Sequence, residues 1–408
     1  MPGDEKTSDT APTHWLIERR VRVFPRLLLV MFVLTVPLYA LTFEGGLDGQ
    51  GRPMGTDFIA FWSAARVTVE GAGIDPWSLL ELERFQLGIF PGLEGPTAWV
   101  YPPTMLLLVW PLGHLPFVPA FLAWTSVGLV AYLVALRPLL SGVRHAWLLA
   151  LAFPGLWLGI AQGQTQFVVS ALMGGALLLL GRHPVLAGVL VGLMTIKPHL
   201  AILFPLVLVA GSHWRTFLSA AVTAVTTFAL AVVAFGQDAL RSWADGMGLV
   251  GSAIDVGALP VYKFVTPYTS FRLLGIPEVP SLLLHVCVAL SAAWVVWTLW
   301  RRSTDIAVRG SALVLGTFLV SPYAADYDLA VLAFPIAWMA LTGIERGWLR
   351  GDRNLLALAW MLPIVVAPIA AATHAGTAPI VLGLMLWQLW KRVSNTSETG
   401  QECVDGVR

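Results

Sequence analysis

Apolar runs of similar length, separated by short polar segments, repeat along almost the whole chain. The first run covers residues 27–43, and others follow it as far as residue 390. A helix of ~20 apolar residues is long enough to cross the hydrocarbon core of a membrane. The pattern therefore predicts an all-α polytopic membrane protein.

Two stretches depart from this spacing. Residues 101–136 are too many for one straight span, and we expect a short or re-entrant helix that breaks near 111–119, followed by a full one. The runs 184–196 and 198–210 would each form ~20 Å of helix, short of a ~30 Å hydrocarbon core. Such half-helices persist only where protein or a water-filled cavity covers their ends. Lys197, between them, would lie at the bottom of that cavity.

Composition excludes an ordinary soluble protein. Hydrophobic residues make up 57% of the 408 residues, charged residues make up 12%, and the mean hydropathy is +0.75. The net charge of +1 indicates no nucleic-acid partner. Cys287 and Cys403 cannot build a disulfide framework or a thiolate metal site. Because the acids are also scattered singly, we expect neither a metal nor a cofactor.

Basic residues predict the orientation. Arg19, Arg20, Arg22 and Arg26 precede the first apolar run, which places the N-terminus in the cytoplasm and the following loop outside. Later boundaries alternate between basic segments and uncharged or mixed ones. This alternation predicts about 12 crossings, at roughly 20 residues for each span, with both termini in the cytoplasm.

We expect three parts along the chain. They are a cytoplasmic N-terminal tail at 1–26, a single transmembrane domain at 27–390 and a cytoplasmic C-terminal tail at 391–408. No small-residue cleavage site follows the first apolar run, so this run is predicted to be a retained span and not a signal peptide. External loops are predicted at 44–100 and 236–280.

Polar motifs gather at the predicted external ends of the spans. They are Asp57, Gly163-Gln164, Lys197-Pro198-His199, residues 236–280 and residues 321–328. The cytoplasmic boundaries carry mainly the basic charges that set orientation. This distribution is typical of a membrane enzyme that works at one surface.

Asp57 lies directly before a helical pattern. Apolar residues recur at helical spacing over 58–70 and Gly71 follows, which predicts an amphipathic helix lying in the membrane interface. Two interpretations of Asp57 stay open. An acid at the start of a helix is commonly a cap, and this acid is also a candidate for chemistry at the external surface.

The order of the motifs resembles a known family. In chain order they are Gly55-Thr56-Asp57-Phe58, Gly73-Ile74-Asp75-Pro76-Trp77, Tyr101-Pro102-Pro103, Pro154 followed by Gly163-Gln164, Ala187-Gly188, Ile196-Lys197-Pro198 and Ser321-Pro322-Tyr323. This order is similar to that of glycosyltransferase family 87 (DUF2029). The family is part of the GT-C superfamily of polyprenol-phosphate-sugar-dependent enzymes and includes mycobacterial mannosyltransferases.

Two positions depart from the family pattern. Gln166 stands where an asparagine is often found, and residues 324–328 replace the histidine-rich stretch of the mannosyltransferases. These departures concern the sugar and the acceptor and leave the class of enzyme unchanged.

The resemblance implies a GT-C-like bundle and a membrane glycosyltransferase. Such an enzyme would move a hexose such as mannose, or a pentose, from a polyprenyl-phosphate donor to a lipid or glycan acceptor, with inversion at the sugar. The reaction would take place on the external face of a bacterial inner membrane. No cofactor is implied.

The resemblance also implies roles for individual residues. An inverting transfer needs a base that takes the proton of the acceptor hydroxyl, and Asp57 matches that role. Cations would stabilise the departing phosphate, and the candidates are Lys197, with His199 beside it, and Arg272. Arg272 and Lys263, in the second external loop, are weaker candidates, for which an ordinary loop charge is the alternative. Lys197 has two other interpretations, because it could instead reach the interface or pair with an acid.

A third group of residues is assigned to the sugar and acceptor pocket. Its members are Tyr101, Gln164, Trp62, Asp326 and Asp328. For the last two acids, capping of a helix is an equal alternative.

Two other classes of function remain as alternatives. A lipid-linked sugar transporter or flippase would move its substrate without chemistry, and such proteins usually repeat their broken helices in both halves. The sequence has a single such break, at Lys197-Pro198. A non-catalytic envelope assembly protein would tolerate the replacement of both Asp57 and Lys197.

Overall fold

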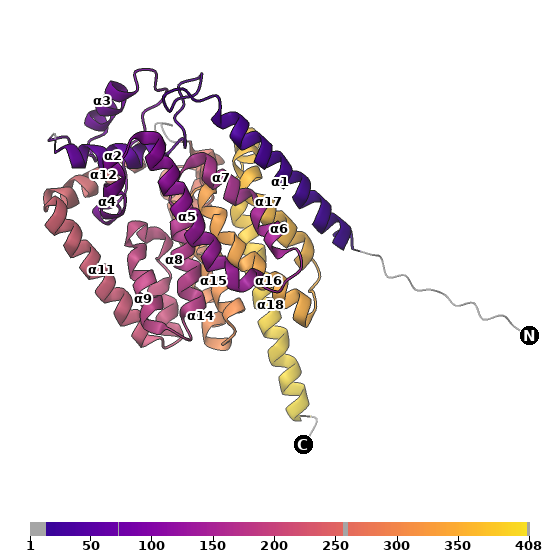
Figure 1. The fold of residues 1–408 in the computed structure, drawn as a ribbon. Helices are drawn as coiled ribbons and strands as arrows, with labels where there is room; N and C mark the ends of the chain where they lie inside the picture. Colours follow the sequence, from indigo (N-terminus) through magenta and orange to yellow (C-terminus); the bar gives the residue numbers. More distant parts are fainter. Residues whose placement is uncertain (1–13, 72, 256–259, 406–408) are drawn as a thin grey trace, which may run out of the picture.

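The computed structural model describes residues 14–71, 73–255 and 260–405, with their side chains except at 249–255 and 396–405 (Figure 1). The predictions for residues 1–13 of the N-terminal tail lie outside the described residues. The same holds for the parts of 236–280 and 391–408 that these ranges omit.

Helices form the described part of the chain, which contains isolated β-bridges but no strand. The α-helices are α1 (Glu18–Ala40), α2 (Phe58–Glu70), α3 (Leu79–Ile89), α4 (Pro103–Val109), α5 (Phe117–Leu140), α6 (Ala146–Leu151), α7 (Pro154–Gln162), α8 (Gln166–Leu179), α9 (Pro184–Leu193), α10 (Phe204–Ala210), α11 (Trp214–Phe235), α12 (Asp238–Asp255), α13 (Pro267–Leu273), α14 (Glu278–Arg302), α15 (Ile306–Val320), α16 (Ala333–Arg346), α17 (Asp352–Thr373) and α18 (Ala378–Asp405). Short 3₁₀ helices are η1 (Trp110–His114), η2 (Met194–Ile196), η3 (Pro198–Leu200), η4 (Val261–Lys263) and η5 (Asp326–Leu332).

Six helical segments of the described chain are long and apolar enough to cross a membrane. They are α1, α5, α11, α14, α17 and the continuous segment Asp326–Arg346. Shorter apolar helices, among them α8 and α15, lie between them. The prediction of an all-helical, multi-pass membrane protein is confirmed, and the number of crossings stays a prediction.

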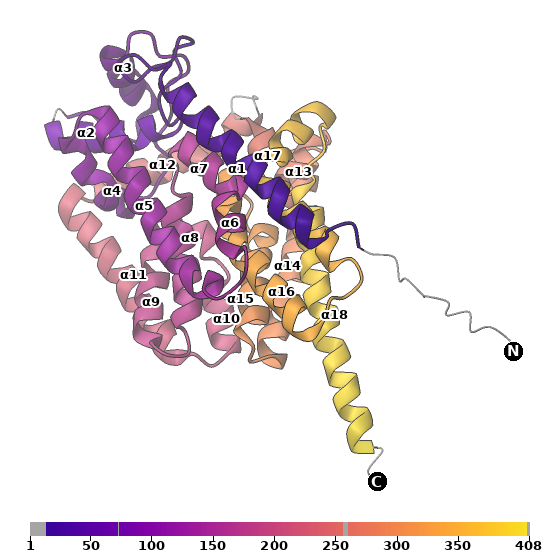
Figure 2. The same ribbon diagram turned by 45° about the vertical axis from the view of Figure 1, so that its right-hand side comes forward.

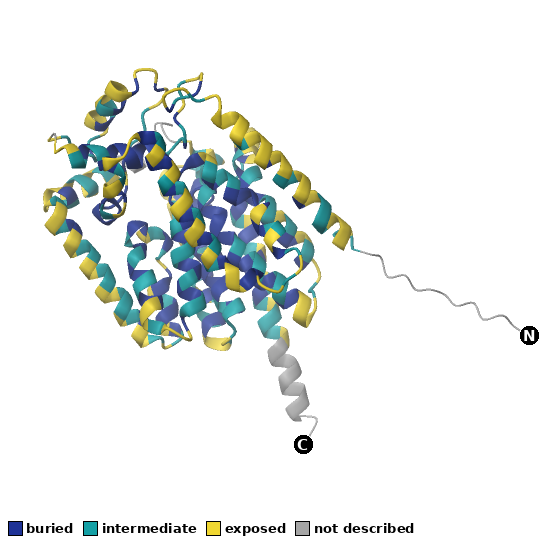
Figure 3. Ribbon diagram, viewed as in Figure 1, coloured by how far each residue is buried: buried dark blue, intermediate teal, exposed yellow. Residues whose placement is uncertain are grey.

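The bundle is buried at its centre and apolar on its outside. Eleven of the fifteen residues of α15 are buried, whereas α1 and α11 present many exposed residues along their outer faces (Figure 3). Val233 of α11, for example, is 84% exposed. Large apolar side chains on the outer surface are what a lipid-facing helix requires.

Both predicted irregularities are present. Residues 101–136 form the short α4, which continues as η1 and ends before Pro116, and then the full-length α5. The second irregularity is the break at Lys197, between the short apolar segments Pro184–Ile196 and Pro198–Ala210. Lys197 itself adopts φ −148° and ψ 69°, outside the helical region.

The helix predicted at 58–70 is present as α2, but its surroundings differ from the prediction. Gly71 ends it in the left-handed conformation, with φ +61°. Nine of its thirteen residues are buried, Ser63 among them, so α2 does not lie with one open polar face in an interface. The cause is that α3, α4, η1 and α5 pack around it.

Two glycines allow α9 to lie directly against α11. A Cβ atom on Gly188 would lie 2.4 Å from the carbonyl oxygen of Thr216, and one on Gly192 would lie 2.5 Å from Cβ of Thr223. Small residues four apart are the usual means by which helices approach closely in a membrane. Gly188, one of the residues that carry the family resemblance, therefore has a packing role.

This contact leads to a first prediction. Gly188→Ala should lower the thermal unfolding temperature of the purified protein, because the added methyl group must push α11 away. Gly383→Ala is the matched control, since Gly383 also lies within a helix but has nothing within 4 Å of an added Cβ. The control should be neutral or stabilising by about 0.5–1 kcal/mol. Equal unfolding temperatures for the two variants would contradict the close contact.

Candidate functional site

Segments far apart in sequence meet at one end of the bundle. In two views α2, α3, α4, α7 and α12 gather at this end (Figures 1 and 2). Hydrogen bonds there join the start of α2, the loop before α4, the turn between α7 and α8, the break at Lys197 and η5. The polar motifs that the sequence placed at the ends of spans thus come together.

Asp57 precedes α2 without capping it through its side chain. It occupies the N-cap position, yet its carboxylate makes no cap hydrogen bond. Instead, Oδ2 accepts a hydrogen bond from Nε2 of Gln164 at 3.0 Å, and the backbone N–H of Asp57 donates to the carbonyl oxygen of Gln162 at 3.1 Å. The Asp57 carboxylate is half-buried. It is therefore held by Gln164, in the turn between α7 and α8, and not by the backbone of α2.

Gly163 permits this approach. It adopts φ +66°, in the left-handed region, and forms the turn between α7 and α8. A Cβ atom at this position would lie 2.8 Å from Cβ of Phe58 and 2.9 Å from the ring of Phe121. Only glycine allows the start of α2 to lie against the turn that carries Gln164.

Tyr101 contacts the same glutamine from the other side. Its hydroxyl donates to Oε1 of Gln164 at 2.6 Å, and its carbonyl oxygen accepts from the indole Nε1 of Trp77 at 2.8 Å. Burial, followed by the negative charges of Asp328 and Asp57, raises the pKa of Tyr101 well above its usual range. The phenol is therefore protonated and is a hydrogen-bond donor.

Lys197 is paired with an acid. Its Nζ lies 2.6 Å from Oδ1 of Asp328 and 3.3 Å from Oγ1 of Thr165, and 4.6 Å from the centre of the Tyr327 ring. Both members of the ion pair are only 3% exposed. The sequence left three interpretations of Lys197 open: contact with a phosphate, reach to the membrane interface, or pairing with an acid. The structure shows the pairing with an acid. A role with a phosphate stays a prediction.

Asp328 has a second contact. Its Oδ2 accepts a hydrogen bond from the backbone N–H of Ala325 at 3.1 Å, at the start of η5. The capping interpretation is thus confirmed for Asp328, alongside the ion pair. Asp326, also buried, accepts at Oδ1 from the backbone N–H of Tyr327 at 2.8 Å.

The electrostatic neighbours of Asp326 include Lys263 and Asp57. Lys263 reaches this end because residues 264–265 pair with 324–325 through the Phe264–Ala325 bridge and the hydrogen bond from Val265 N to the Ala324 carbonyl at 2.8 Å. Lys263 was a weaker candidate from the sequence for contact with the donor phosphate, and that role stays a prediction.

Three other predicted site residues have separate surroundings. His199 is half-buried in η3, close enough to Lys197 to sense its charge. Trp62 is 5% exposed and donates its indole N–H to the carbonyl oxygen of Leu115 at 2.9 Å, so it belongs to the packing of α2. Arg272 lies in α13 and donates from Nη1 to the carbonyl oxygen of Ile276 at 3.1 Å. The functional roles of all three stay predictions.

Sequence reasoning missed Thr165, Tyr327 and Gln162. The first two contact Lys197, and the third accepts the backbone N–H of Asp57. Gln162 and Thr165 flank the Gly163-Gln164 motif, and Tyr327 lies between two predicted acids. Their nearness to known motifs was the available signal.

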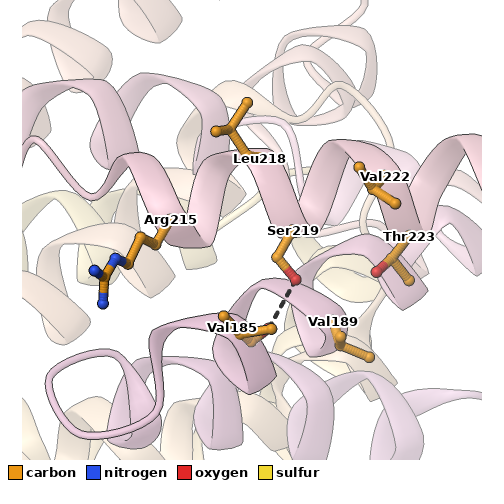
Figure 4. A pocket seen from close by; sticks show the side chains of 7 residues that line it. All are labelled: Val185, Val189, Arg215, Leu218, Ser219, Val222 and Thr223. Atoms are coloured by element: carbon orange, nitrogen blue, oxygen red, sulfur yellow. Dashed lines mark hydrogen bonds between the residues drawn. The ribbon is translucent and has the colours of Figure 1, made fainter.

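A hollow in the surface lies elsewhere. It has a volume of about 560 Å³ and opens between α9 and α11 (Figure 4). Its lining is mostly apolar, with Arg215 at one end, and Ser219 donates to the carbonyl oxygen of Val185 at 2.8 Å. None of the predicted site residues lines this hollow, so it contributes nothing to the cluster around Asp57.

Metal ligands are not grouped in the part of the chain that the structure describes. There, no set of three or more His, Cys, Asp or Glu side chains could hold a metal ion. Whether the reaction needs a metal stays a prediction from the sequence.

Comparison with known proteins identifies the family. The model of glycosyltransferase family 87 matches residues 99–322, more than half of the chain. The chain belongs to glycosyltransferase family 87. The matched region contains Tyr101, Gln164 and Lys197, whereas Asp57 precedes it and Asp328 follows it. No curated protein and no solved structure matches the chain.

Family membership and the six long apolar helices together make the chain a multi-pass membrane glycosyltransferase. A glycosyltransferase acts on a sugar donor and an acceptor. The cluster is the candidate active site because it brings together the polar motifs that carry the family resemblance.

The buried ion pair leads to a second prediction. Lys197→Met and Asp328→Asn should each destabilise the protein by about 3–5 kcal/mol, because each leaves one buried charge without its partner. The double variant removes both charges and should recover part of that loss. Thermal unfolding of the purified protein in detergent measures these changes.

The exposed pair Arg241–Asp238, at 2.9 Å, provides the control. Arg241→Met should change stability by no more than about 0.5 kcal/mol. If the losses from the two single variants at Lys197 and Asp328 simply add in the double variant, the two charges do not stabilise each other.

Proposed function

We propose that this glycosyltransferase moves a hexose or pentose from a polyprenyl-phosphate donor to a lipid or glycan acceptor, with Asp57 as general base. The observation that carries the proposal is the state of the Asp57 carboxylate. It makes no cap bond, and only Oδ2 is bound, to Gln164. Within the described part of the chain, Oδ1 accepts no hydrogen bond, and this oxygen is the one that would receive a proton.

The proposed step is an inverting displacement. The acceptor hydroxyl oxygen forms a bond to the anomeric carbon of the sugar as the bond from that carbon to the phosphate oxygen breaks. The electron pair of the broken bond leaves with the polyprenyl phosphate, and the hydroxyl proton passes to Oδ1 of Asp57. A single base suffices because the phosphate leaves as an anion without needing a proton.

Lys197 and His199 are the proposed contacts of the donor phosphate, with Arg272 as a weaker candidate. Lys197 is neutralised by Asp328 at 2.6 Å. A phosphate that approached it would therefore share the lysine with that carboxylate, which supports a role in which phosphate binding loosens the ion pair. Fixed positive charge near the phosphate would stabilise the negative charge that develops as the bond breaks.

Asp326 and Asp328 remain the proposed contacts for sugar hydroxyls, because carboxylates accept hydrogen bonds from hydroxyl groups. Asp328 also bonds to Lys197 and to the backbone N–H of Ala325, and Asp326 bonds to the backbone N–H of Tyr327. Trp62, which is buried in the packing of α2, is the weakest of the proposed pocket residues.

The proposed location is the external face of a bacterial inner membrane, with both termini in the cytoplasm. The support is the alternation of basic and uncharged boundaries along the sequence. The meeting of α2, α7 and the break at Lys197 at one end of the bundle agrees with a single working face.

The third prediction tests the base. Asp57→Asn should lower transfer from polyprenyl-phosphate sugars to a membrane lipid extract by about 10²–10⁴-fold, because the amide cannot accept the proton. Product formed by the purified protein is measured by mass spectrometry. The variant should keep the unfolding temperature of the wild type, since the Asp57 side chain makes no cap bond.

Asp75→Asn is the matched control, an acid in the same loop whose Oδ1 accepts from the backbone N–H of Trp77 at 2.9 Å. An asparagine can keep this bond, so activity should be unchanged. Full activity of Asp57→Asn would remove Asp57 from the mechanism.

A further inference from the structure

The neighbours of Gln164 determine which way its side-chain amide faces. Oε1 accepts from the backbone N–H of Thr165 at 3.3 Å as well as from the hydroxyl of Tyr101 at 2.6 Å. A backbone N–H can only donate, so the oxygen must face Thr165. The amide NH₂ then faces Asp57, whose carboxylate oxygen Oδ2 accepts the hydrogen bond. The reversed orientation would place two acceptors against each other.

Neighbouring side chains hold Tyr101 and Gln164 in place. The indole of Trp124 donates to the carbonyl oxygen of Gly163 at 3.0 Å, which fixes the turn below Gln164. The indole of Trp77 donates to the carbonyl oxygen of Tyr101. The Tyr101 ring also packs on Phe61 of α2, with ring centres 5.0 Å apart. The glutamine and the tyrosine therefore have little freedom to turn.

We infer that Gln164 and Tyr101 are positioning residues, which hold the Asp57 carboxylate by Oδ2 so that Oδ1 faces the acceptor hydroxyl. This inference rests on the proposed role of Asp57 as the base. It replaces the expectation from the sequence that the two side chains contact the sugar. Tyr101 orients the amide, the amide orients the carboxylate, and neither needs to touch a substrate.

Other titratable and charged groups near Asp57 also influence how activity depends on pH. Tyr101 lies beside it, and Asp326 and Tyr327 of η5 face it. Lys263 of η4 offsets Asp326, and Lys197 is bound to Asp328. A carboxylate at position 164 would lie against Asp57 and would also accept from the Tyr101 hydroxyl. Tyr101 already stays protonated, so the group whose charge state the new carboxylate changes near neutral pH is the pair formed by residues 164 and 57.

The fourth prediction concerns Gln164→Glu. This nearly isosteric change places a second carboxylate against Asp57, so the two acids share their protons and titrate as a pair. The acid limb of the profile of kcat/KM against pH should move to higher pH by about one unit or more. Initial rates of transfer by the full-length protein, with the polyprenyl-phosphate sugar that the wild type uses, provide this profile.

The fifth prediction concerns Tyr101→Phe, which removes only the hydroxyl. Loss of one hydrogen bond to the amide should lower kcat by about threefold to tenfold, because the carboxylate spends less time in the productive orientation. KM for donor and acceptor should stay within about twofold, since the hydroxyl does not bind either.

Tyr132→Phe is the matched control. Tyr132 is also buried and donates its hydroxyl to a carbonyl oxygen, that of Ala330, at 2.9 Å. Its loss should lower the unfolding temperature without a change in kcat. A Tyr101→Phe variant that behaves like this control would show a structural role only and would overturn the inference.

The outcomes separate this inference from the proposed function. Full transfer by Asp57→Asn would overturn both. An inactive Asp57→Asn combined with a Gln164→Glu profile that superimposes on the wild type would overturn the positioning role alone. A raised KM with unchanged kcat in Tyr101→Phe would return the tyrosine to the substrate pocket and would likewise overturn its role as a positioning residue.

Discussion

A buried ion pair between Lys197 and Asp328 holds the two halves of the polar cluster together. Lys197 lies where one helix is interrupted, in surroundings that would make an isolated ammonium group costly. Asp328 satisfies that charge from a segment 131 residues away, and Thr165 adds a contact from the turn that carries Gln164. The interrupted helix, the α7–α8 turn and η5 are thus joined at one point, on which the geometry around Asp57 depends.

The arrangement explains why polar groups can collect inside an apolar bundle. Half-helices are tolerated in a membrane only where other parts of the protein cover their ends. Here Asp328 of η5 and Thr165 contact Lys197 at the break, and Phe58 of α2 lies against Gly163 in the turn beside it. Lys197 and Asp328 are each only 3% exposed, and exclusion of water strengthens the electrostatic contact between them. A glycosyl transfer in which water must not replace the acceptor benefits from both effects.

Local features of the sequence predicted the local features of the structure. The helix at 58–70, the interruption at Lys197 and the short helix before α5 all follow from spacing, proline and glycine, which act over a few residues. The contacts of the site do not. Gln164 bonds to Asp57 across 107 residues, and Asp328 was known only as an acid near a helix start until its partner was seen.

The position of α2 was also mispredicted because it depends on contacts with distant segments. The sequence suggested that α2 lies in the membrane interface. Its apolar face was clear from the sequence, but the short helices that bury Ser63 on the other face belong to segments whose packing no local pattern reveals. The surroundings of the Trp62 side chain were likewise not visible from the local sequence. Its position in an external loop suggested a surface for a sugar, whereas its hydrogen bond to Leu115 places it within the packing.

The central claim, a polyprenyl-phosphate donor, is tested most directly by donor choice. The purified full-length protein is incubated with membrane lipid extract and either a panel of polyprenyl-phosphate hexoses and pentoses or the matching nucleotide sugars. Products are then identified by mass spectrometry. The account predicts a product heavier by one hexose or pentose with a lipid-linked donor and none with the nucleotide sugars. A product that forms only from a nucleotide sugar would contradict it.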